Sequence, residues 1–374
     1  MRPRLPASRH DASRRGWQYS LHIDAPLLFA LVGVSILGLM VLYSASGEDT
    51  DLVRRQLTRL GIAFAGMFAV AQITPQVLLR STPWVFVTGI LLLFAVLVMG
   101  EVSGGAQRWL DLYIIRFQPS EMMKLAVPMM VAWYLADVRL PPNRYHLLAG
   151  GVIIVVPVLM IAKQPDLGTS MLIASSGFFV LFLAGLQWGL LGFLTLIAAA
   201  AAPLLWHFMH DYQRVRVITF MNPERDPLGA GYHIIQSKIA IGSGGLFGKG
   251  WLNGTQSQLD FLPERSTDFI FAVLGEEFGF LGILLLFAFY IFIVIRSTLI
   301  AIQAQDTFTR LLAGSLALTF FVYIIVNTGM VTGLLPVVGL PLPMISYGGT
   351  SIVTLMAGFG ILMSIQTHRK LLPT

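Results

Sequence analysis

The stretch PLLFALVGVSILGLMVLYSAS, residues 26–46, decides the fold class. It runs over 21 residues without a charge, and about 20 apolar residues in a helix cross the hydrocarbon core of a bilayer. The run is too long for the apolar part of a cleavable signal peptide, which has about 7–15 residues. Five arginines lie within the first 20 residues. We therefore expect an uncleaved first span that follows a basic cytoplasmic tail, residues 1–25.

The rest of the chain repeats this apolar pattern. The 374 residues are 56% hydrophobic and 12% charged, with a mean hydropathy of +0.75, which excludes a soluble single-core domain and a disordered chain. Cysteine is absent, so disulfides and thiolate metal sites are excluded. Apolar windows of spanning length lie at 26–46, 57–73, 83–99, 121–136, 147–162, 169–186, 189–206, 269–295, 311–331 and 351–367. We predict an all-α polytopic membrane protein with about ten transmembrane helices.

Ten crossings place both termini on the same side of the membrane. A single transmembrane domain is expected over residues 26–367, with a cytoplasmic tail at 368–374. About half of the 25 basic residues fall on the outer side in this topology, so the orientation depends on the arginines before the first span. The net charge of +6 reflects topology and anionic lipid in a membrane chain, and no nucleic-acid partner is expected.

Most of the outer polar residues belong to one large extracytoplasmic loop, residues 207–267, between the seventh and eighth windows. Loops of about 60 residues are usually functional or disordered. The stretch GYHIIQSKIAI (231–241) spaces its apolar residues as an amphipathic helix does. Such a helix either lies on the membrane surface or forms a wall of an active site. The glycine-rich stretch IGSGGLFGKG (241–250) follows it.

An ionisable side chain in a membrane-spanning segment costs about 2.5–3.5 kcal/mol on insertion scales. Such residues therefore indicate a pairing partner or a functional site. Glu121 and Lys124 are three residues apart in QPSEMMKL (118–125), where they form either a neutralising pair behind an N-cap at Ser120 or part of a site. Asp166 lies in KQPDLGTS (163–170) and is either a turn residue or a functional carboxylate. Arg108, followed by a tryptophan, is either an interfacial anchor or a ligand-binding cation.

Asp268 is the strongest candidate among the carboxylates. It is the last polar residue of LPERSTDF (262–269) before a long apolar run, where Asp serves as an N-cap. Two further glutamates follow two turns into the same helix, and capping does not explain them. A carboxylate at a boundary between water and apolar surface has its pKa raised toward the range of a general base.

The last outer segment, TGLLPVVGLPLPMISYGGTS (332–351), contains three prolines and four glycines. Irregular backbone at membrane depth is tolerated only where it is buried in protein or lines a wet cavity. We therefore predict a re-entrant loop, with Ser346 on its polar face. The sequence has no phosphate-binding GxxxxGK[ST], no HExxH and no GxSxG, so the expected chemistry uses carboxylates on a substrate with an anionic head and an apolar tail.

The strings RFQPSEMMKL (116–125), KQPDLGTS (163–170), GTQSQLDFLPERSTDFIFAVLGEE (254–277) and GLPLPMISYGGTS (339–351) resemble the SEDS family (shape, elongation, division and sporulation). The resemblance extends from the first span to the last. The GTQSQLDFLPE segment favours the branch that acts in cell elongation over the one that acts in division. One departure is Ser266, which stands where a His is expected.

The resemblance implies a peptidoglycan glycosyltransferase that polymerises lipid II on the outer face of the bacterial cytoplasmic (inner) membrane. It implies an essential role for Asp268 and roles for Glu121, Lys124 and Asp166. The implied partners are a class B penicillin-binding protein, which supplies transpeptidation, and other membrane proteins of the elongation complex. The implied ligands are lipid II and the undecaprenyl-linked glycan.

These features predict separate roles for acidic and basic residues at the outer side of the membrane. Asp268 is expected to act as general base, and the departing diphosphate needs positive charge. The remaining candidates for substrate binding lie in the outer connections, namely Arg108, Lys124, Arg214, Arg216, Glu264 and Ser346. The sequence leaves open whether a divalent cation, Mg or Mn, bridged by Glu121 or Asp166 shares this task.

Three other functions remain open at this level. A lipid II flippase needs a passage that reaches both faces, whereas the ionisable residues here gather near one. A secondary transporter places its charged site near the midplane, with broken helices in both halves. A non-catalytic scaffold of the elongation machinery tolerates the loss of Asp268.

Overall fold

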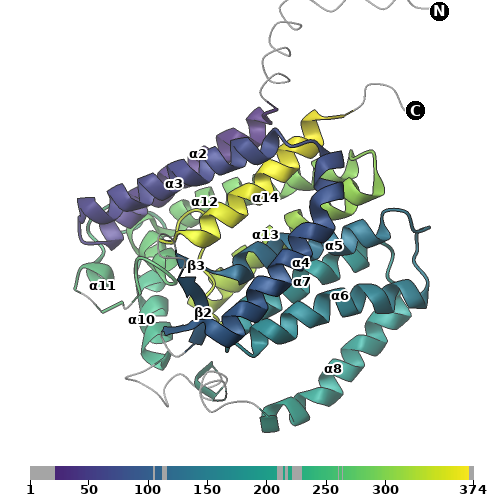
Figure 1. Cartoon of the computed structure of the whole chain (residues 1–374). Helices are drawn as coiled ribbons and strands as arrows, with labels where there is room; N and C mark the ends of the chain where they lie inside the picture. The colour runs from purple at the N-terminus through teal and green to yellow at the C-terminus, as the bar shows by residue number, and fades with distance from the viewer. Residues whose placement is uncertain are drawn as a thin grey trace, which may run out of the picture.

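The structure is a computed structural model of the whole chain. It describes residues 22–103, 106–111, 116–208, 214, 218–220, 230–259, 261–262 and 264–369. The helices are α2 (Ala25–Ala45), α3 (Thr50–Ala71), α4 (Pro75–Met99), α5 (Pro119–Leu135), α6 (Arg144–Ala162), α7 (Leu167–Leu183), α8 (Trp188–Phe208), α10 (Ala230–Ser243), α11 (Thr255–Gln258), α12 (Ile270–Ile302), α13 (Thr307–Val331) and α14 (Thr350–Thr367) (Figure 1).

Each of the ten apolar windows coincides with a helix, and the multi-pass helical fold is confirmed. Within the part of the chain that the structure describes, six helices are long and apolar enough to cross a membrane: α2, α4, α6, α12, α13 and α14. The helix expected at 231–241 is present as α10. Its buried residues recur at every third position, Ile234, Ser237 and Ala240, and this face packs against α12 and α13.

The all-α fold includes one small sheet that the sequence did not predict. Three short antiparallel strands lie between α4 and α5, in the order β1 (Glu101–Ser103), β2 (Ala106–Asp111) and β3 (Arg116–Phe117). Strands of two to six residues are too short for an alternating pattern to be recognised. The expected N-cap at Ser120 is also corrected, because α5 begins at Pro119 with Gln118 as its N-cap.

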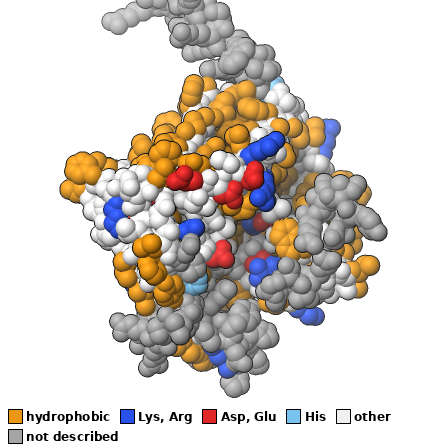
Figure 2. Space-filling model, turned by 90° about the vertical axis from the view of Figure 1, so that its left-hand side faces the viewer, with side chains coloured by type: hydrophobic (Ala, Val, Ile, Leu, Met, Phe, Trp, Pro, Cys, Tyr) orange, Lys and Arg blue, Asp and Glu red, His pale blue; other side chains and the backbone are white. Residues whose placement is uncertain are grey.

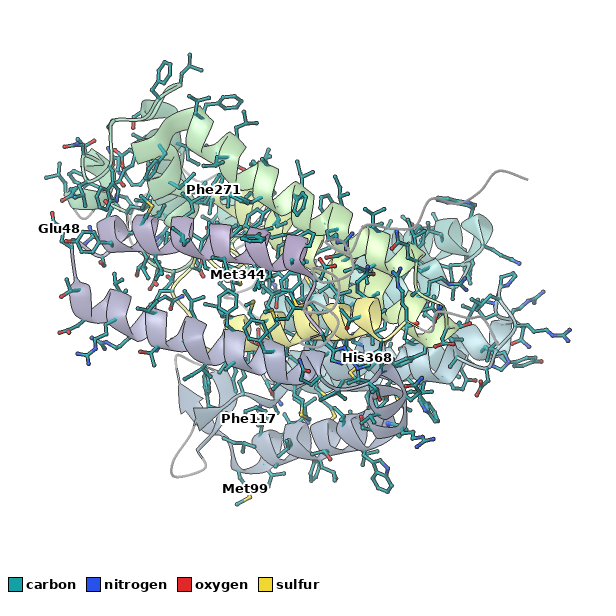
Figure 3. The ribbon with its side chains drawn as sticks, turned by 90° about the horizontal axis from the view of Figure 1, so that it is seen from above. Glu48, Met99, Phe117, Phe271, Met344 and His368 are labelled. Atoms are coloured by element: carbon teal, nitrogen blue, oxygen red, sulfur yellow. The ribbon has the colours of Figure 1, made fainter. Side chains whose placement is uncertain are left out.

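The helices pack into one bundle. α3 packs along α14, α12 packs against α2 and α13, and α7 lies between α5, α6 and α13. α8 projects at the edge of the bundle (Figure 1). Glu48 lies at one edge of the molecule, whereas His368, at the C-terminal end of α14, lies well inside this view (Figure 3). The rings of His22 and His368 stack at 3.9 Å, so the first and last described residues share one end, as an even number of crossings requires.

The loop between α13 and α14 enters the bundle deeply. A Cβ atom on Gly38 of α2 would lie 2.7 Å from the carbonyl oxygen of Met344. Gly38 is seven residues from the end of α2, which corresponds to about 10 Å along a helix. The hydroxyl of Tyr290 in α12 donates to the carbonyl of Pro343 at 2.7 Å. This irregular backbone is enclosed by protein, as the prediction of a re-entrant loop requires.

α12 is interrupted at Gly279, whose φ of 62° and ψ of −159° are not helical. In an unbroken helix, the amides of Phe280 and Leu281 would donate to the carbonyls of residues 276 and 277. Residues 245–250 stand between these groups instead. The amides of Phe280 and Leu281 donate to the carbonyls of Gly245 and Leu246, at 2.9 and 3.1 Å. We call residues 244–250 the insert loop.

The insert loop also satisfies the two helix carbonyls on the other side of the break. The carbonyls of Glu276 and Glu277 accept from the amides of Lys249 and Gly250, both at 3.0 Å. The close approach depends on glycine, because a Cβ on Gly248 (φ +80°) would lie 2.1 Å from the carbonyl oxygen of Glu277. These two amides and two carbonyls beside the break are therefore hydrogen-bonded.

Candidate active site

Asp268 lies in a turn, residues 264–269, that is fastened to the re-entrant loop. Ser346 accepts from the amide of Leu342 at 2.8 Å and donates to the carbonyl of Thr267 at 2.6 Å. The amide of Tyr347 donates to the carbonyl of Ser266 at 2.8 Å. These bonds fix the backbone directly before the partly buried Asp268.

The re-entrant loop brings Asp268 and Asp166 to one region. A Cβ on Gly339 would lie 3.6 Å from Oδ2 of Asp268, and a Cβ on Gly168, in the first turn of α7, would lie 2.8 Å from the carbonyl oxygen of Val338. Residues 338 and 339 thus stand between the two carboxylate-bearing segments. The positions of these segments come from tertiary packing and were not available from spacing in the chain.

Asp166 combines two of the roles that the sequence left open. Its Oδ1 accepts from the amide of Thr169 at 3.3 Å and caps α7. Its Oδ2 faces Nε of Arg108 at 3.6 Å and accepts from Nε2 of Gln118 at 3.4 Å. Arg108 also donates to the carbonyl of Pro165 at 3.0 Å. Arg108 on β2 is therefore attached to the N-terminus of α7, with its side chain 38% exposed.

Glu121 and Lys124 form the predicted pair on one face of α5. Their Oε1 and Nζ atoms are 2.7 Å apart, and both side chains are buried. Nζ of Lys124 lies 5.5 Å from the centre of the Tyr323 ring on α13. Lys124 and Tyr323 line a largely apolar cavity between α5, α13 and α14. Oε2 of Glu121 has no hydrogen-bond partner among the described residues. This arrangement keeps a buried charge pair beside apolar space.

The other predicted residues take different positions. Glu264 is exposed and accepts from the hydroxyl of Thr267 at 2.6 Å. Arg214 donates to the carbonyl of Trp206 at 3.1 Å, beside the end of α8. Ser346 is buried and both its contacts are structural. Arg216 lies outside the described residues.

Asn327 is a residue of this site that the sequence reasoning missed. It is fully buried in α13, and its Nδ2 donates to the carbonyls of Asp268 at 3.1 Å and Leu340 at 2.8 Å. It therefore joins the Asp268 turn to the re-entrant loop. The available signal was an amide within an apolar window, where a polar side chain needs a hydrogen-bond partner.

The donor set does not fit a divalent cation at Glu121 or Asp166. Among the described residues, no group of three or more His, Cys, Asp or Glu side chains converges. Glu121 is already paired with Lys124, and Asp166 with Arg108. Since a hard cation prefers several oxygen ligands, neither carboxylate provides a suitable site for such an ion.

The end of the bundle that carries α10 and α11 is mixed in charge. Figure 2 shows acidic and basic side chains gathered on this face, with hydrophobic surface around them. A site of this kind suits a ligand with a polar, anionic head and an apolar tail that stays in the membrane.

Comparison with known proteins decides the family. The family of FtsW, RodA and SpoVE, described as "Cell cycle protein", matches residues 25–371. This chain belongs to the SEDS family. Within the family it is 55% identical to the peptidoglycan glycosyltransferase MrdB of Escherichia coli (strain K12) over 353 residues, which cover 94% of this chain and 95% of that protein.

Two solved structures share the SEDS fold. One is described as "Structural coordination of polymerization and crosslinking by a peptidoglycan synthase complex"; it has a TM-score of 0.82 and 32% identity, and the match covers 93% of this chain and 98% of that one. The other is the rod shape determining protein RodA of Thermus thermophilus, with a TM-score of 0.71, 28% identity, and coverage of 93% and 98%. This SEDS chain therefore has the multi-pass helical fold of its relatives.

Proposed function

We propose that this chain polymerises lipid II into glycan strands during cell elongation, with Asp268 as the general base. The chain is a peptidoglycan glycosyltransferase, as its 55% identity to MrdB over nearly the whole length of both proteins indicates. The observation that supports the role of Asp268 is the fastening of its turn by Ser346, Tyr347 and Asn327, which holds a partly buried carboxylate at one end of the bundle.

Asp268 accepts the proton of the GlcNAc 4-hydroxyl of one lipid II molecule. That oxygen forms a bond with the MurNAc anomeric carbon of the growing strand, from the face opposite the leaving group. The bond from this carbon to the diphosphate oxygen breaks, and its electron pair leaves with undecaprenyl diphosphate. The anomeric configuration is inverted. A base and a stabilised leaving group are the two requirements of this step.

The departing diphosphate is stabilised by cations of the same region. Arg108 is held beside Asp166 with part of its side chain exposed, and Lys124 lies at the wall of the apolar cavity. Arg214 and Arg216 are further candidates in the outer loop. A guanidinium at headgroup depth suits a diphosphate because it donates two hydrogen bonds to one anionic group.

The active site is proposed to face outward, with both termini in the cytoplasm and a class B penicillin-binding protein as partner. α10 and α11, the described helices of the large outer loop, lie at one end of the bundle (Figure 1), and both contact α12, which begins directly after the Asp268 turn. The solved peptidoglycan synthase complex contains a chain with the same fold, which supports a transpeptidase partner.

The test is lipid II polymerisation in liposomes by the purified wild type and Asp268→Asn, each co-expressed with the partner. Asn keeps the shape of the side chain but cannot take the proton, so long strands are expected from the wild type alone. Thermal unfolding and co-purification of the partner verify that the variant is folded and bound.

Other outcomes point to other functions. Equal strand formation by both proteins contradicts the role of Asp268. Net translocation of lipid II without strands indicates a flippase, and neither activity indicates a scaffold. Cell shape on depletion separates elongation from division, because rounded cells indicate the first and filaments the second.

A further inference from the structure

We propose that Glu276 and Lys249 are positioning residues that hold Asp268 in its catalytic place. This proposal rests on the proposed function of Asp268. It concerns the ion pair at the far end of the short helical segment that begins beside this carboxylate.

The break at Gly279 divides α12 into two unequal parts. Residues 270–278 precede the break, and every residue from Phe269 to Glu277 is buried. Residues 280–302 follow it and carry many exposed apolar side chains, among them Leu284, Ile291 and Ile295. The first part is therefore a short buried helix with Asp268 at one end and Glu276 at the other. No continuous helical backbone connects it to the peripheral part, so its position depends on side contacts.

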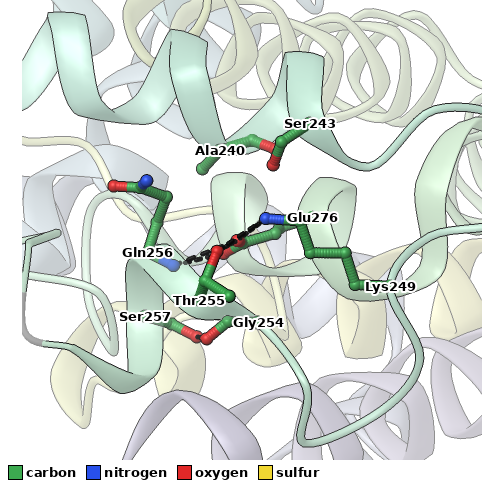
Figure 4. A network of polar contacts seen from close by, with 8 residues as sticks. All are labelled: Ala240, Ser243, Lys249, Gly254, Thr255, Gln256, Ser257 and Glu276. Carbon is green, nitrogen blue, oxygen red and sulfur yellow. Dashed lines mark hydrogen bonds and ion pairs between the residues drawn. The ribbon is translucent and has the colours of Figure 1, made fainter.

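Glu276 makes the densest set of these contacts (Figure 4). It is fully buried, and its Oε1 lies 2.7 Å from Nζ of Lys249 in the insert loop. The same oxygen accepts from the hydroxyl of Thr255 and from the amide of Gln256, both at 3.0 Å. Nζ of Lys249 also donates to the Thr255 hydroxyl at 2.6 Å. One carboxylate thus ties the insert loop and the start of α11 to the buried helix.

A second connection runs from α11 to the Asp268 turn. Ser257 of α11 is buried, and its carbonyl accepts from the guanidinium of Arg265, three residues before Asp268. Glu276 therefore supports Asp268 along two routes, directly through the buried helix and through α11 and Arg265. The neighbouring Glu277 accepts instead from Ser44 of α2, so it contacts a different element.

The charge of Glu276 matters for this function. A buried carboxylate is stable only when it is paired and hydrogen-bonded, and here Lys249, Thr255 and Gln256 supply both. Glutamine in its place is neutral and loses the ion pair, while its size is unchanged. A misplacement of about 1 Å in a catalytic group costs up to about 10²-fold in rate. We therefore expect a loss in kcat without a matching loss of substrate binding.

The experiment compares Glu276→Gln, Lys249→Met and Lys249→Arg with the wild type, each as the full chain with its partner. Strand formation is measured over a range of lipid II concentrations. Glu276→Gln and Lys249→Met are expected to lower kcat at least tenfold, with KM within about twofold, since only positioning is lost. Lys249→Arg keeps the charge and is expected to keep most of the activity.

Glu48→Gln is the matched control. It replaces a carboxylate by an amide, as Glu276→Gln does, but at an exposed position. Hydrogen exchange supplies a readout that does not depend on activity. The amides of Thr267 and Phe269 donate to the carbonyl of Glu264, and in Glu276→Gln we expect both to exchange about tenfold faster while the rest of the chain is unchanged. The control leaves them unchanged.

Each outcome decides the proposal. A kcat within twofold of the wild type, a rise in KM alone, or faster exchange throughout the chain overturns the positioning role. If Asp268→Asn is inactive while Glu276→Gln is fully active, only this inference fails. If Asp268→Asn is as active as the wild type, or if the wild type forms no strands, the proposed function fails and this inference fails with it.

Discussion

At the scale of single residues, the buried pair of Glu121 and Lys124 separates a structural role from a functional one. Lys124→Met leaves the Glu121 carboxylate buried without its cation, and we expect this to destabilise the fold by about 3–5 kcal/mol. The double variant with Glu121→Gln removes both charges and is expected to recover most of that stability.

Strand formation gives the second measurement on this pair. If Lys124 stabilises the diphosphate, the double variant recovers the thermal unfolding temperature in detergent but not the activity. Recovery of both the unfolding temperature and the activity would show that the pair has a structural role only, in which each charge neutralises the other inside the bundle.

The residues found from the sequence and those missed differ in their surroundings. Asp268, Asp166, Glu121 and Lys124 were predicted because a charge beside an apolar window is costly and stands out. Asn327 was missed because a neutral amide inside a window looks like ordinary helix, and its contacts with Asp268 and Leu340 involve segments that are distant in sequence.

At the scale of elements, the insert loop predicts which glycines are indispensable. Gly248→Ala places a Cβ 2.1 Å from the carbonyl oxygen of Glu277 at a φ of +80°, so clash and backbone strain are expected to destabilise the protein by about 3 kcal/mol or more. Gly242→Ala is the control, because nothing lies within 4 Å of its Cβ in α10, where alanine favours the helix by up to about 1 kcal/mol. Unfolding midpoints in detergent measure both, and equal midpoints would contradict the role of the loop.

The helices that hydropathy indicates were predicted correctly from the sequence. All ten apolar windows are helices because each needs its backbone groups paired within the segment. The sheet at 101–117 and the break in α12 were not predicted, since both depend on hydrogen bonds between segments that the apolar pattern does not relate. The glycine-rich stretch at 241–250 was noted in the sequence, but the sequence did not indicate that it pairs with α12.

At the scale of the whole molecule, the stacked rings of His22 and His368 join the first and last described segments. Partial burial, and then the neighbouring His368 ring, lower the pKa of His22 below its ordinary value of 6.5. The unfolded chain therefore binds this proton more readily than the folded protein, and stability falls as the pH falls below about 6.5. We expect the unfolding temperature to decrease between pH 7.5 and 5.5.

His22→Gln tests the source of this decrease. The variant cannot take up the proton, so its unfolding temperature is expected to change less over the same pH interval. An identical decrease in both proteins would place the effect at other groups.

The break in α12 has a consequence for the order of biosynthesis. In hydrocarbon, each unpaired backbone group costs several kcal/mol, and at the break at Gly279 two amides and two carbonyls of α12 pair with the insert loop. Their partners in residues 245–250 precede the break by about thirty positions, so the ribosome releases the insert loop before the helix that it completes. Nascent chains that end shortly after Leu281 already contain every group needed for this pairing. A rearranged gene that moves the insert loop behind α12 would leave the helix incomplete while it enters the membrane.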